Sequence, residues 1–279
     1  MKNILILGAG KVGTSLNIAL RSTGYSNVAM KGRQGEKASE AGADYLDELS
    51  DELLTRVDLI FICVQDSKIT DTVKELRRFN LSGKRIVHTS GAYDSQILAS
   101  LRTKGAKTGS FHPIQTFPDK SLPLKIWNRI VCTYEGDEEN RQMLSEICSR
   151  FGARLLPVTP DQKTALHLAA VVSANYMIAL FSWAENIISD AGINELPANE
   201  LLGNIIEQVA GNYKNQSSEK ILTGPLARGD WETIEKHLEY LKNYPAKYSL
   251  IYKKLAELLL DDRKFNIPNR DKLEKILLT

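Results

Sequence analysis

The sequence predicts an α/β domain with a doubly wound parallel sheet, followed by an all-helical domain. A continuous apolar run over residues 58–64 is typical of a central parallel strand, and such runs alternate with helical patterns up to residue 156. The alternation stops after two prolines within residues 157–163. We therefore place the domain boundary near residue 158, giving domains at 1–158 and 159–279, in keeping with about 150 residues per domain.

The expected elements follow from the hydrophobic patterns in chain order. In the first domain, strands are expected at 3–7, 27–30, 58–64, 86–89, 108–111, 129–132 and 154–156, and helices at 14–21, 67–79, 95–102 and 137–151. The second domain is built on one long helix at 164–191 that is apolar on nearly every face and is therefore expected to be buried. Its cover is expected from a second subunit and from amphipathic helices at 201–213, 231–241 and 247–260.

A glycine-rich turn connects the first strand to the first helix. Gly8, Gly10 and Gly13 spell G-x-G-x-x-G, with Ala9 and Val12 at intervening positions. In this context the first glycine permits a tight turn, the second lets the backbone approach a pyrophosphate, and the third lets the helix pack on the strand. The motif predicts a Rossmann domain that binds a dinucleotide, and the alternative is a helix-capping turn without a ligand.

A loop for nucleoside triphosphates is excluded by spacing. Leu5 stands where such a loop needs its first glycine, and Val12 follows Lys11 where a serine or threonine is needed.

The residues after the second strand bear on the choice of cofactor. An acidic residue about 20 positions after the glycine motif selects the unphosphorylated ribose, but the first acid here is Glu36. Lys31 and Arg33 supply positive charge instead, and a guanidinium suits a phosphate. NADP(H) is therefore favoured over NAD(H), with a solvated basic loop as the alternative.

Polar residues gather where the next strands end, which is the edge at which ligands bind in open parallel sheets. Val64, Ser90 and Gly91 are expected beside the nicotinamide, and Gln115 beside the substrate. His88 lies within an apolar strand and is interpreted as a core imidazole.

Two further histidines are candidates for acid/base chemistry. His112 begins an irregular loop at a strand end, and His167 lies on the long helix four residues after Lys163. Asn175 follows eight residues later, rotated by roughly 80° and about 12 Å along an α-helix, so the pair could bracket a small substrate. Their spacing does not suggest a metal site, and none is expected.

A loop-like segment at residues 222–230 carries two more candidates. Thr223 and Arg228 are expected to bind the substrate, whereas Asp230 is explained as the cap of the next helix. The alternative for Arg228 is a local ion pair.

Composition excludes several classes of partner. The 36 basic and 34 acidic side chains give a net charge of +2, which predicts no binding to nucleic acid or to anionic membranes. The cysteines, Cys63, Cys132 and Cys148, lack metal or redox spacing and are interpreted as reduced core thiols. The start of the chain shows no secretory pattern, and the apolar stretch at 168–183 is short for a membrane span. A cytoplasmic location is expected.

Several motifs in order resemble one group of proteins. They are the glycine motif at 8–13, H-T-S-G at 88–91, H-P-I-Q-T-F at 112–117, Asn175 and T-G-P-L-A-R-G-D at 223–230. In this order, these motifs resemble those of Rossmann-like candidate NADP oxidoreductases with a C-terminal helical domain of unknown function. The resemblance spans nearly the whole chain. More distantly, the chain is similar to the 6-phosphogluconate and 3-hydroxyisobutyrate dehydrogenase superfamily and to pyrroline-carboxylate reductase. It implies a homodimer formed through the helical domain.

The expected function is an NADP(H)-dependent oxidoreductase that acts on a small carbonyl, imine or hydroxyacid in the interdomain cleft. His112 or His167 would move the proton, because Val171 occupies the position at which the related hydroxyacid dehydrogenases carry a lysine. That departure motivates the main alternative, a catalytically inactive dinucleotide-binding sensor or regulatory dimer. Methyl transfer from S-adenosylmethionine is a weaker alternative.

Overall fold

The computed structural model describes residues 2–32, 44–119 and 124–278. Contacts divide the chain into two units, Met1–Leu180 and Phe181–Thr279. The first unit contains the sheet and the helix that follows it, and the second unit is helical. The boundary predicted near residue 158 coincides with the end of the sheet region. That a separate domain begins there stays a prediction.

Eight strands of the described chain form one sheet in the order β3-β2-β1-β4-β5-β6-β7-β8. The strands are β1 (Ile4–Leu7), β2 (Val28–Lys31), β3 (Asp44–Tyr45), β4 (Leu59–Ile62), β5 (Arg85–His88), β6 (Lys107–Pro113), β7 (Val131–Gly136) and β8 (Arg154–Pro157). β1 lies between β2 and β4, with Leu7 opposite both Lys31 and Ile62. This register brings the ends of β2, β1 and β4 to one edge of the sheet.

One strand pair departs from the expected parallel arrangement. β6 and β7 are antiparallel, with His112 opposite Thr133, whereas β7 and β8 are parallel again. A parallel pair needs a crossover, usually through an α-helix. The described part of the connection between β6 and β7 contains only the short 3₁₀ helix η3 (Leu124–Trp127), so the chain returns in the opposite direction.

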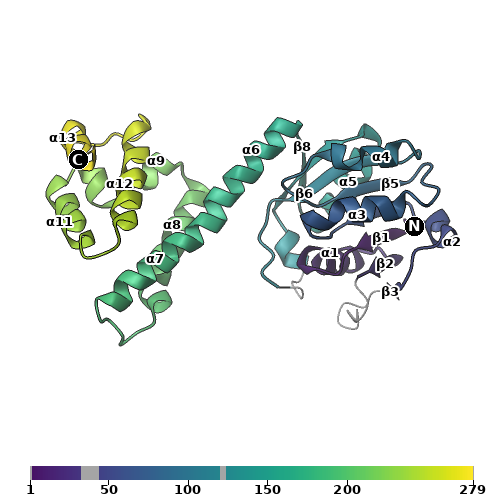
Figure 1. The fold of residues 1–279 in the computed structure, drawn as a ribbon, viewed down its shortest axis with the longest axis horizontal. Helices are drawn as coiled ribbons and strands as arrows, with labels where there is room; N and C mark the ends of the chain where they lie inside the picture. The colour runs from purple at the N-terminus through teal and green to yellow at the C-terminus, as the bar shows by residue number, and fades with distance from the viewer. Residues whose placement is uncertain (1, 33–43, 120–123, 279) are drawn as a thin grey trace. The chain divides into compact units, whose positions relative to one another are not determined.

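Helices cover both faces of the sheet (Figure 1). α1 (Lys11–Ser22) and α5 (Glu138–Phe151) pack on one face, and α3 (Asp66–Leu76) and the short helices α2 (Asp51–Arg56), η2 (Ser95–Leu98) and α4 (Ala99–Arg102) pack on the other. Alternate residues of β1 enter the two cores, Ile4 and Ile6 one of them and Leu5 and Leu7 the other. Burial on both faces explains why the central strands are apolar without interruption.

The long helix begins earlier than predicted and is interrupted. α6 (Pro160–Ala170) starts with a capping box, in which Thr159 Oγ1 accepts from the backbone N–H of Gln162 and Gln162 Oε1 accepts from that of Thr159, at 3.2 and 2.9 Å. A π-helical segment, η4 (Val171–Asn175), leads from α6 into α7 (Tyr176–Asp190). A π turn holds an extra residue, so residues after it are displaced around the axis relative to an ideal α-helix. The 80° estimated between His167 and Asn175 therefore does not hold.

The second unit has a small core of its own. Its helices after α7 are α8 (Ala198–Asn215), α9 (Ser218–Ile221), α10 (Gly224–Arg228), α11 (Trp231–Leu241), α12 (Ala246–Asp261) and α13 (Arg270–Leu278). Leu226, Ile234, Leu260 and Leu273 are among the residues of the core formed by α10 to α13. α8, by contrast, has no buried residue.

The expectation that the long helix is buried is wrong for the single chain. Leu168, Tyr176 and Ile178 are exposed at 59, 59 and 63%, and α7 has no buried residue. Within the described residues, the helix Pro160–Asp190 is long and apolar enough to cross a membrane by length and composition. The core helix of a soluble protein passes the same test, so one such helix is weak evidence of a span.

Candidate functional site

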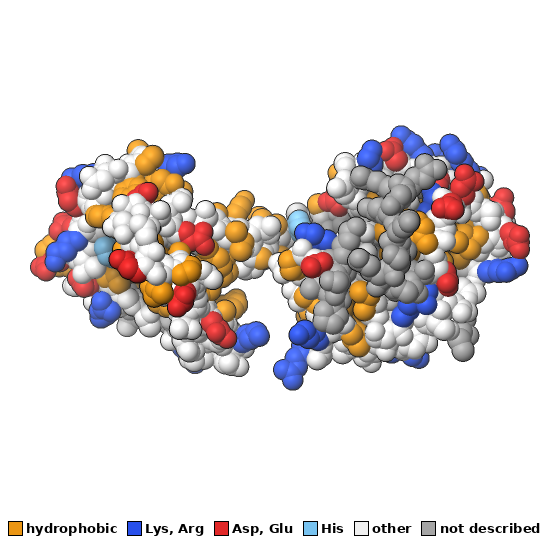
Figure 2. Space-filling model, turned by 90° about the horizontal axis from the view of Figure 1, so that it is seen from below, with side chains coloured by type: hydrophobic (Ala, Val, Ile, Leu, Met, Phe, Trp, Pro, Cys, Tyr) orange, Lys and Arg blue, Asp and Glu red, His pale blue; other side chains and the backbone are white. Residues whose placement is uncertain are grey.

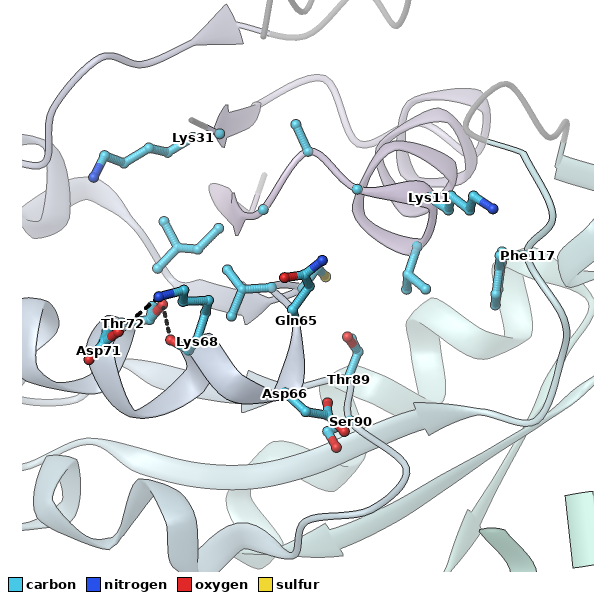
Figure 3. A pocket seen from close by; sticks show the side chains of 18 of the residues that line it. Lys11, Lys31, Gln65, Asp66, Lys68, Asp71, Thr72, Thr89, Ser90 and Phe117 are labelled. Atoms are coloured by element: carbon cyan, nitrogen blue, oxygen red, sulfur yellow. Dashed lines mark hydrogen bonds and ion pairs between the residues drawn. The ribbon is translucent and has the colours of Figure 1, made fainter. Parts of the chain in front are cut away.

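A cavity of about 910 Å³ lies over the strand edge where β2, β1, β4 and β5 end (Figure 3). The glycine turn and Val64 lie on its wall, together with Ser90, Gly91 and Gln115. Figure 3 shows Lys31 and Lys68 on the opposite side of this cavity from Lys11 and Phe117. The cavity therefore has two ends, one at β2 and α3 and the other at Ser90, Gln115 and Phe117.

The glycine turn has the tight geometry that the motif predicts. Gly8 has φ +114°, and a Cβ on it would lie 2.6 Å from the carbonyl oxygen of Cys63. A Cβ on Gly13 would overlap the carbonyl oxygen of Gly8, so the helix can approach the strand only with glycine here. Gly10, at the start of α1, has space for a methyl group, with its nearest contact at 4.0 Å.

The turn leaves helix donors available for an anion. Gly10 is the N-cap of α1 and has no side chain with which to cap the first N–H groups. Gly8, Ala9, Gly10, Lys11 and Val12 all line the cavity. A helix N-terminus with uncapped donors suits a phosphate, which is the arrangement in a dinucleotide-binding turn. Gly13 contributes by packing rather than by lining the cavity.

At the β2 end of the cavity a carboxylate is present that the local sequence did not reveal. Lys31 Nζ lies 2.6 Å from Oε1 of Glu75, which belongs to the last turn of α3, and both residues line the cavity. The fold thus brings a carboxylate to the end of β2 from 44 residues along the chain. Arg33, the other predicted phosphate ligand, lies outside the described residues.

At the other end, Ser90 and Gly91 form part of the wall. The Ser90 hydroxyl accepts hydrogen bonds from the backbone N–H groups of Ala92 and Tyr93, at 3.1 and 3.3 Å. It therefore stabilises the turn after β5. Gln115 lines the cavity and donates from Nε2 to the carbonyl of Ile126, at 3.3 Å.

Two predicted catalytic histidines meet at Gly91. The rings of His112 and His167 lie edge to face with centroids 5.7 Å apart. A Cβ on Gly91 would come within 2.9 Å of His112 Cε1 and within 2.8 Å of His167 Cε1. None of the described residues that line the cavity is a histidine. The structure thus brings both rings beside the cavity wall, and their roles stay predictions.

Burial alters the chemistry of these histidines. Desolvation lowers the pKa of His112 to about 4, although its Nδ1 lies 3.1 Å from the carbonyl oxygen of Thr89. With this lowered pKa, His112 is neutral at pH 7. Nδ1 of His167 is buried without a hydrogen-bond partner among the described residues. His88 is fully buried, as predicted, and desolvation lowers its pKa to about 4.

Lys163 is a member of this cluster to which the sequence analysis assigned no role. Its side chain is buried at 3% exposure, and Nζ donates to the carbonyl oxygen of Ser90 at 2.7 Å. Desolvation lowers the pKa of Lys163 to about 8. The available signal was its spacing of four residues from His167, which puts both on one face of α6. Through these two side chains α6 contacts the Ser90–Gly91 segment.

Three further predicted substrate residues are exposed in the single chain. Asn175 ends the π segment and is exposed in the single chain. Thr223 and Arg228 are exposed in the second unit. Arg228 lies 3.8 Å from Asp230, and Asp230 caps α11 by accepting from the backbone N–H of Thr233 at 3.2 Å. The local interpretation of Asp230 is confirmed, and the substrate roles of Asn175, Thr223 and Arg228 stay predictions.

Comparisons with known proteins agree with this architecture. Residues 2–113 match the Rossmann-like domain, and residues 130–259 match a domain of unknown function, DUF2520. No curated protein matches the chain in sequence.

Solved structures resemble the chain over most of its length. A candidate NADP oxidoreductase, BF3122 from Bacteroides fragilis, is 25% identical with a TM-score of 0.71, covering 92% of this chain and 96% of its own. Protein TM1727 from Thermotoga maritima is 26% identical with the same TM-score, covering 92 and 97%. A pyrroline-5-carboxylate reductase from Coxiella burnetii, 14% identical with a TM-score of 0.60, covers 99 and 98% and shares the fold.

The resemblance expected from the sequence motifs is therefore confirmed: the chain joins a Rossmann-like domain to a DUF2520 domain, in the fold of candidate NADP oxidoreductases and pyrroline-carboxylate reductases.

Proposed function

We propose that the protein is an NADP(H)-dependent oxidoreductase that reduces or oxidises a small carbonyl, imine or hydroxyacid. The observation that carries the proposal is the single cavity that extends from Lys31, over the glycine turn, to Ser90 and Gly91. Its two ends suit the two nucleosides of a dinucleotide, and the uncapped start of α1 between them suits the pyrophosphate. The similarity to BF3122 supports NADP(H) as the nucleotide.

The chain's residues divide into those that hold the cofactor and those beside the reacting end. Gly8, Ala9, Gly10 and Val12 surround the pyrophosphate, while Lys31 and Arg33 bind the 2′-phosphate. The nicotinamide, which supplies or accepts a hydride, is held by Val64, Ser90 and Gly91, with Gln115 toward the substrate. NADP(H) is favoured over NAD(H) in this proposal because Lys31 ends β2.

Proton transfer is assigned to the cluster beside Gly91. Among the described residues, Nδ1 of His167 has no hydrogen-bond partner, whereas His112 is neutral at pH 7 and donates its Nδ1–H to the carbonyl oxygen of Thr89. We therefore assign the acid/base role to His167 and a supporting, edge-to-face contact to His112. Asn175, Thr223 and Arg228 orient an acidic substrate in this proposal.

We also propose that the active form is a homodimer built through the helical unit. Apolar side chains are exposed on α7 and α8, including Ile178 at 63%, Ile205 at 63% and Val209 at 52%, and Figure 2 shows hydrophobic surface on the helical part. Exposed apolar patches of this kind mark interaction sites, and a second copy would cover them.

Binding measurements test the cofactor assignment. Calorimetry should detect NADPH binding to the wild-type protein, and Gly10→Ala should weaken it by about tenfold or more, because the added methyl group occupies the approach of the pyrophosphate. The free protein has room for that methyl group, so the variant should fold. Gly203→Ala in α8, where a Cβ would meet nothing within 4 Å, is the matched control and should bind as the wild type does. Failure of both NADPH and NADH to bind at about 1 mM would refute the proposal.

A sensor is the second candidate function, favoured by Val171 in place of the lysine of related dehydrogenases. Stoichiometric NADPH binding without oxidation across a panel of carbonyls and imines would support the sensor over the enzyme. Tighter binding of S-adenosylmethionine than of NADPH would instead support methyl transfer.

A further inference from the structure

We infer that Glu75 is a specificity-determining residue at the adenosine end of the cavity, where it holds Lys31 and limits the preference for a 2′-phosphorylated dinucleotide. This inference rests on the proposed function, because it concerns which nicotinamide nucleotide the cavity selects. It adds a residue from α3 to a choice that the sequence attributed to the residues after β2 alone.

The position of Lys31 is set by the sheet. Lys31 is the last residue of β2, and its carbonyl oxygen accepts a hydrogen bond from the N–H of Gly8, at 2.7 Å. Its backbone is therefore tied to the glycine turn. From this point its side chain reaches α3, where Nζ meets Glu75 Oε1 at 2.6 Å. Figure 3 shows Lys31 on the same side of the cavity as Asp71 and Thr72 of α3.

The ion pair is partly shielded from water. The Lys31 side chain is 20% exposed and that of Glu75 is 38% exposed, and both line the cavity. Elsewhere on α3, Lys68 lies 3.5 Å from Asp71, with both side chains more than half exposed. The pair at Lys31 is therefore less exposed to solvent than the Lys68–Asp71 pair, and its electrostatic attraction is less weakened by water and salt.

The charge of Glu75 acts in opposite directions on the two nucleotides. A 2′-phosphate would compete with the carboxylate for the Lys31 ammonium and would be repelled by the carboxylate itself. An unphosphorylated ribose carries hydroxyl groups that can donate to a carboxylate, which is how acidic residues select NAD in this fold. Glu75 thus disfavours NADP(H) and favours NAD(H), against the direct effect of Lys31.

The experiment compares dissociation constants for NADPH and NADH by calorimetry at fixed ionic strength. Glu75→Gln keeps the size and hydrogen-bonding capacity of the side chain but removes its charge. We expect the ratio of the NADH to the NADPH dissociation constant to rise by about five- to tenfold, with NADPH binding more tightly and NADH less tightly. Lys31→Met should shift the ratio the other way.

Two controls separate the ion pair from a general change of charge. Asp71→Asn removes the same charge from the same wall but does not pair with Lys31, so it should change the ratio by less than about twofold. In the Lys31→Met background, Glu75→Gln should change the logarithm of the ratio of the NADH to the NADPH dissociation constant by less than half as much as it does in the wild type. Thermal unfolding of each variant checks that it is folded.

The outcomes distinguish this inference from the proposed function. If the wild type binds NADPH but Glu75→Gln leaves the ratio within twofold, or Asp71→Asn shifts it equally, the role of Glu75 is refuted and the cofactor assignment stands. If the wild type binds neither nucleotide, the proposed function fails and this inference fails with it.

Discussion

The sheet and the helices after it bury their apolar residues to different degrees. All four residues of β1 and all four of β4 are buried, and helices pack against both faces of the sheet. α7 and α8 are amphipathic or apolar, yet the single chain buries no residue of either helix. The sheet region therefore covers its own hydrophobic surface, whereas α7 and α8 leave theirs exposed in the single chain.

The largest effect is expected from a substitution in the sheet region. Gly13→Val should lower the free energy of unfolding by about 4 kcal/mol or more, because its side chain would overlap the carbonyl oxygen of Gly8, which is backbone and cannot rotate away. Urea denaturation followed by circular dichroism measures the change. The control is Gly211→Ala in α8, where nothing lies within 4 Å and the change should stay within about 1 kcal/mol of zero or be stabilising. Equal losses in both variants would contradict the difference between the two regions.

An intermediate effect of opposite sign is expected at Lys163, where the sheet region buries a charge. Lys163→Met should raise the free energy of unfolding at pH 7 by about 1–3 kcal/mol, because desolvating the ammonium costs more than its hydrogen bond to Ser90 returns. The same substitution should reduce turnover if the Ser90–Gly91 segment holds the nicotinamide.

The pH dependence identifies the cause. Unfolded Lys163 keeps its proton up to about pH 10.5, whereas the folded group loses it near its lowered pKa of about 8. The unfolded state therefore binds more protons between these values, and the stability of the wild type should rise relative to that of Lys163→Met as the pH increases from 8 to 10.5. Lys107→Met is the control, because Lys107 is exposed and its ion pair with Glu139 raises its pKa. The stability of the wild type relative to that of Lys107→Met should not rise over the same pH range. A wild type that loses stability relative to Lys163→Met across this window would contradict the assignment.

A substitution on α8 is expected to have the smallest effect on the unfolding free energy of the single chain but a clear effect on dimer formation. Ile205→Glu should change the unfolding free energy of the monomer by about 0.5 kcal/mol or less, since the side chain is 63% exposed. Sedimentation velocity should show that it shifts a wild-type dimer toward monomer. Asn199→Glu adds the same charge to an exposed polar position of α8 and should leave the dimer intact. A monomeric wild type, or a dimer unaffected by Ile205→Glu, would contradict the proposed interface.

Local patterns predicted the fold well where the determinants lie within a few residues. The apolar run that forms β4 and the glycine motif before α1 correspond to the observed strand and turn. The antiparallel pairing of β7 was not predictable in this way, because strand direction depends on how the chain crosses the sheet. The start of α6 at Pro160 depended on a capping box that the hydrophobic pattern does not reveal.

The candidate site was less predictable because its interactions connect distant parts of the chain. The contact of Glu75 with Lys31 spans 44 residues, and that of Lys163 with Ser90 spans 73. Asn175 lies on the long helix that was expected to be buried because it is apolar, but in the single chain that apolar surface is exposed. Apolar composition indicates which surfaces need cover, while only the assembled molecule determines what covers them.

Alkylation of the three cysteines can report the opening of the first unit. All of them belong to that unit and are buried, so an alkylating reagent cannot reach them while the sheet is closed, and burial also raises the pKa of the Cys63 thiol to about 12. Labelling must wait for local or global opening. All three cysteines belong to the core between the sheet and α1 and α5, so the rate at which their peptides gain mass would record the opening of that face, with no contribution from the helices beyond residue 180.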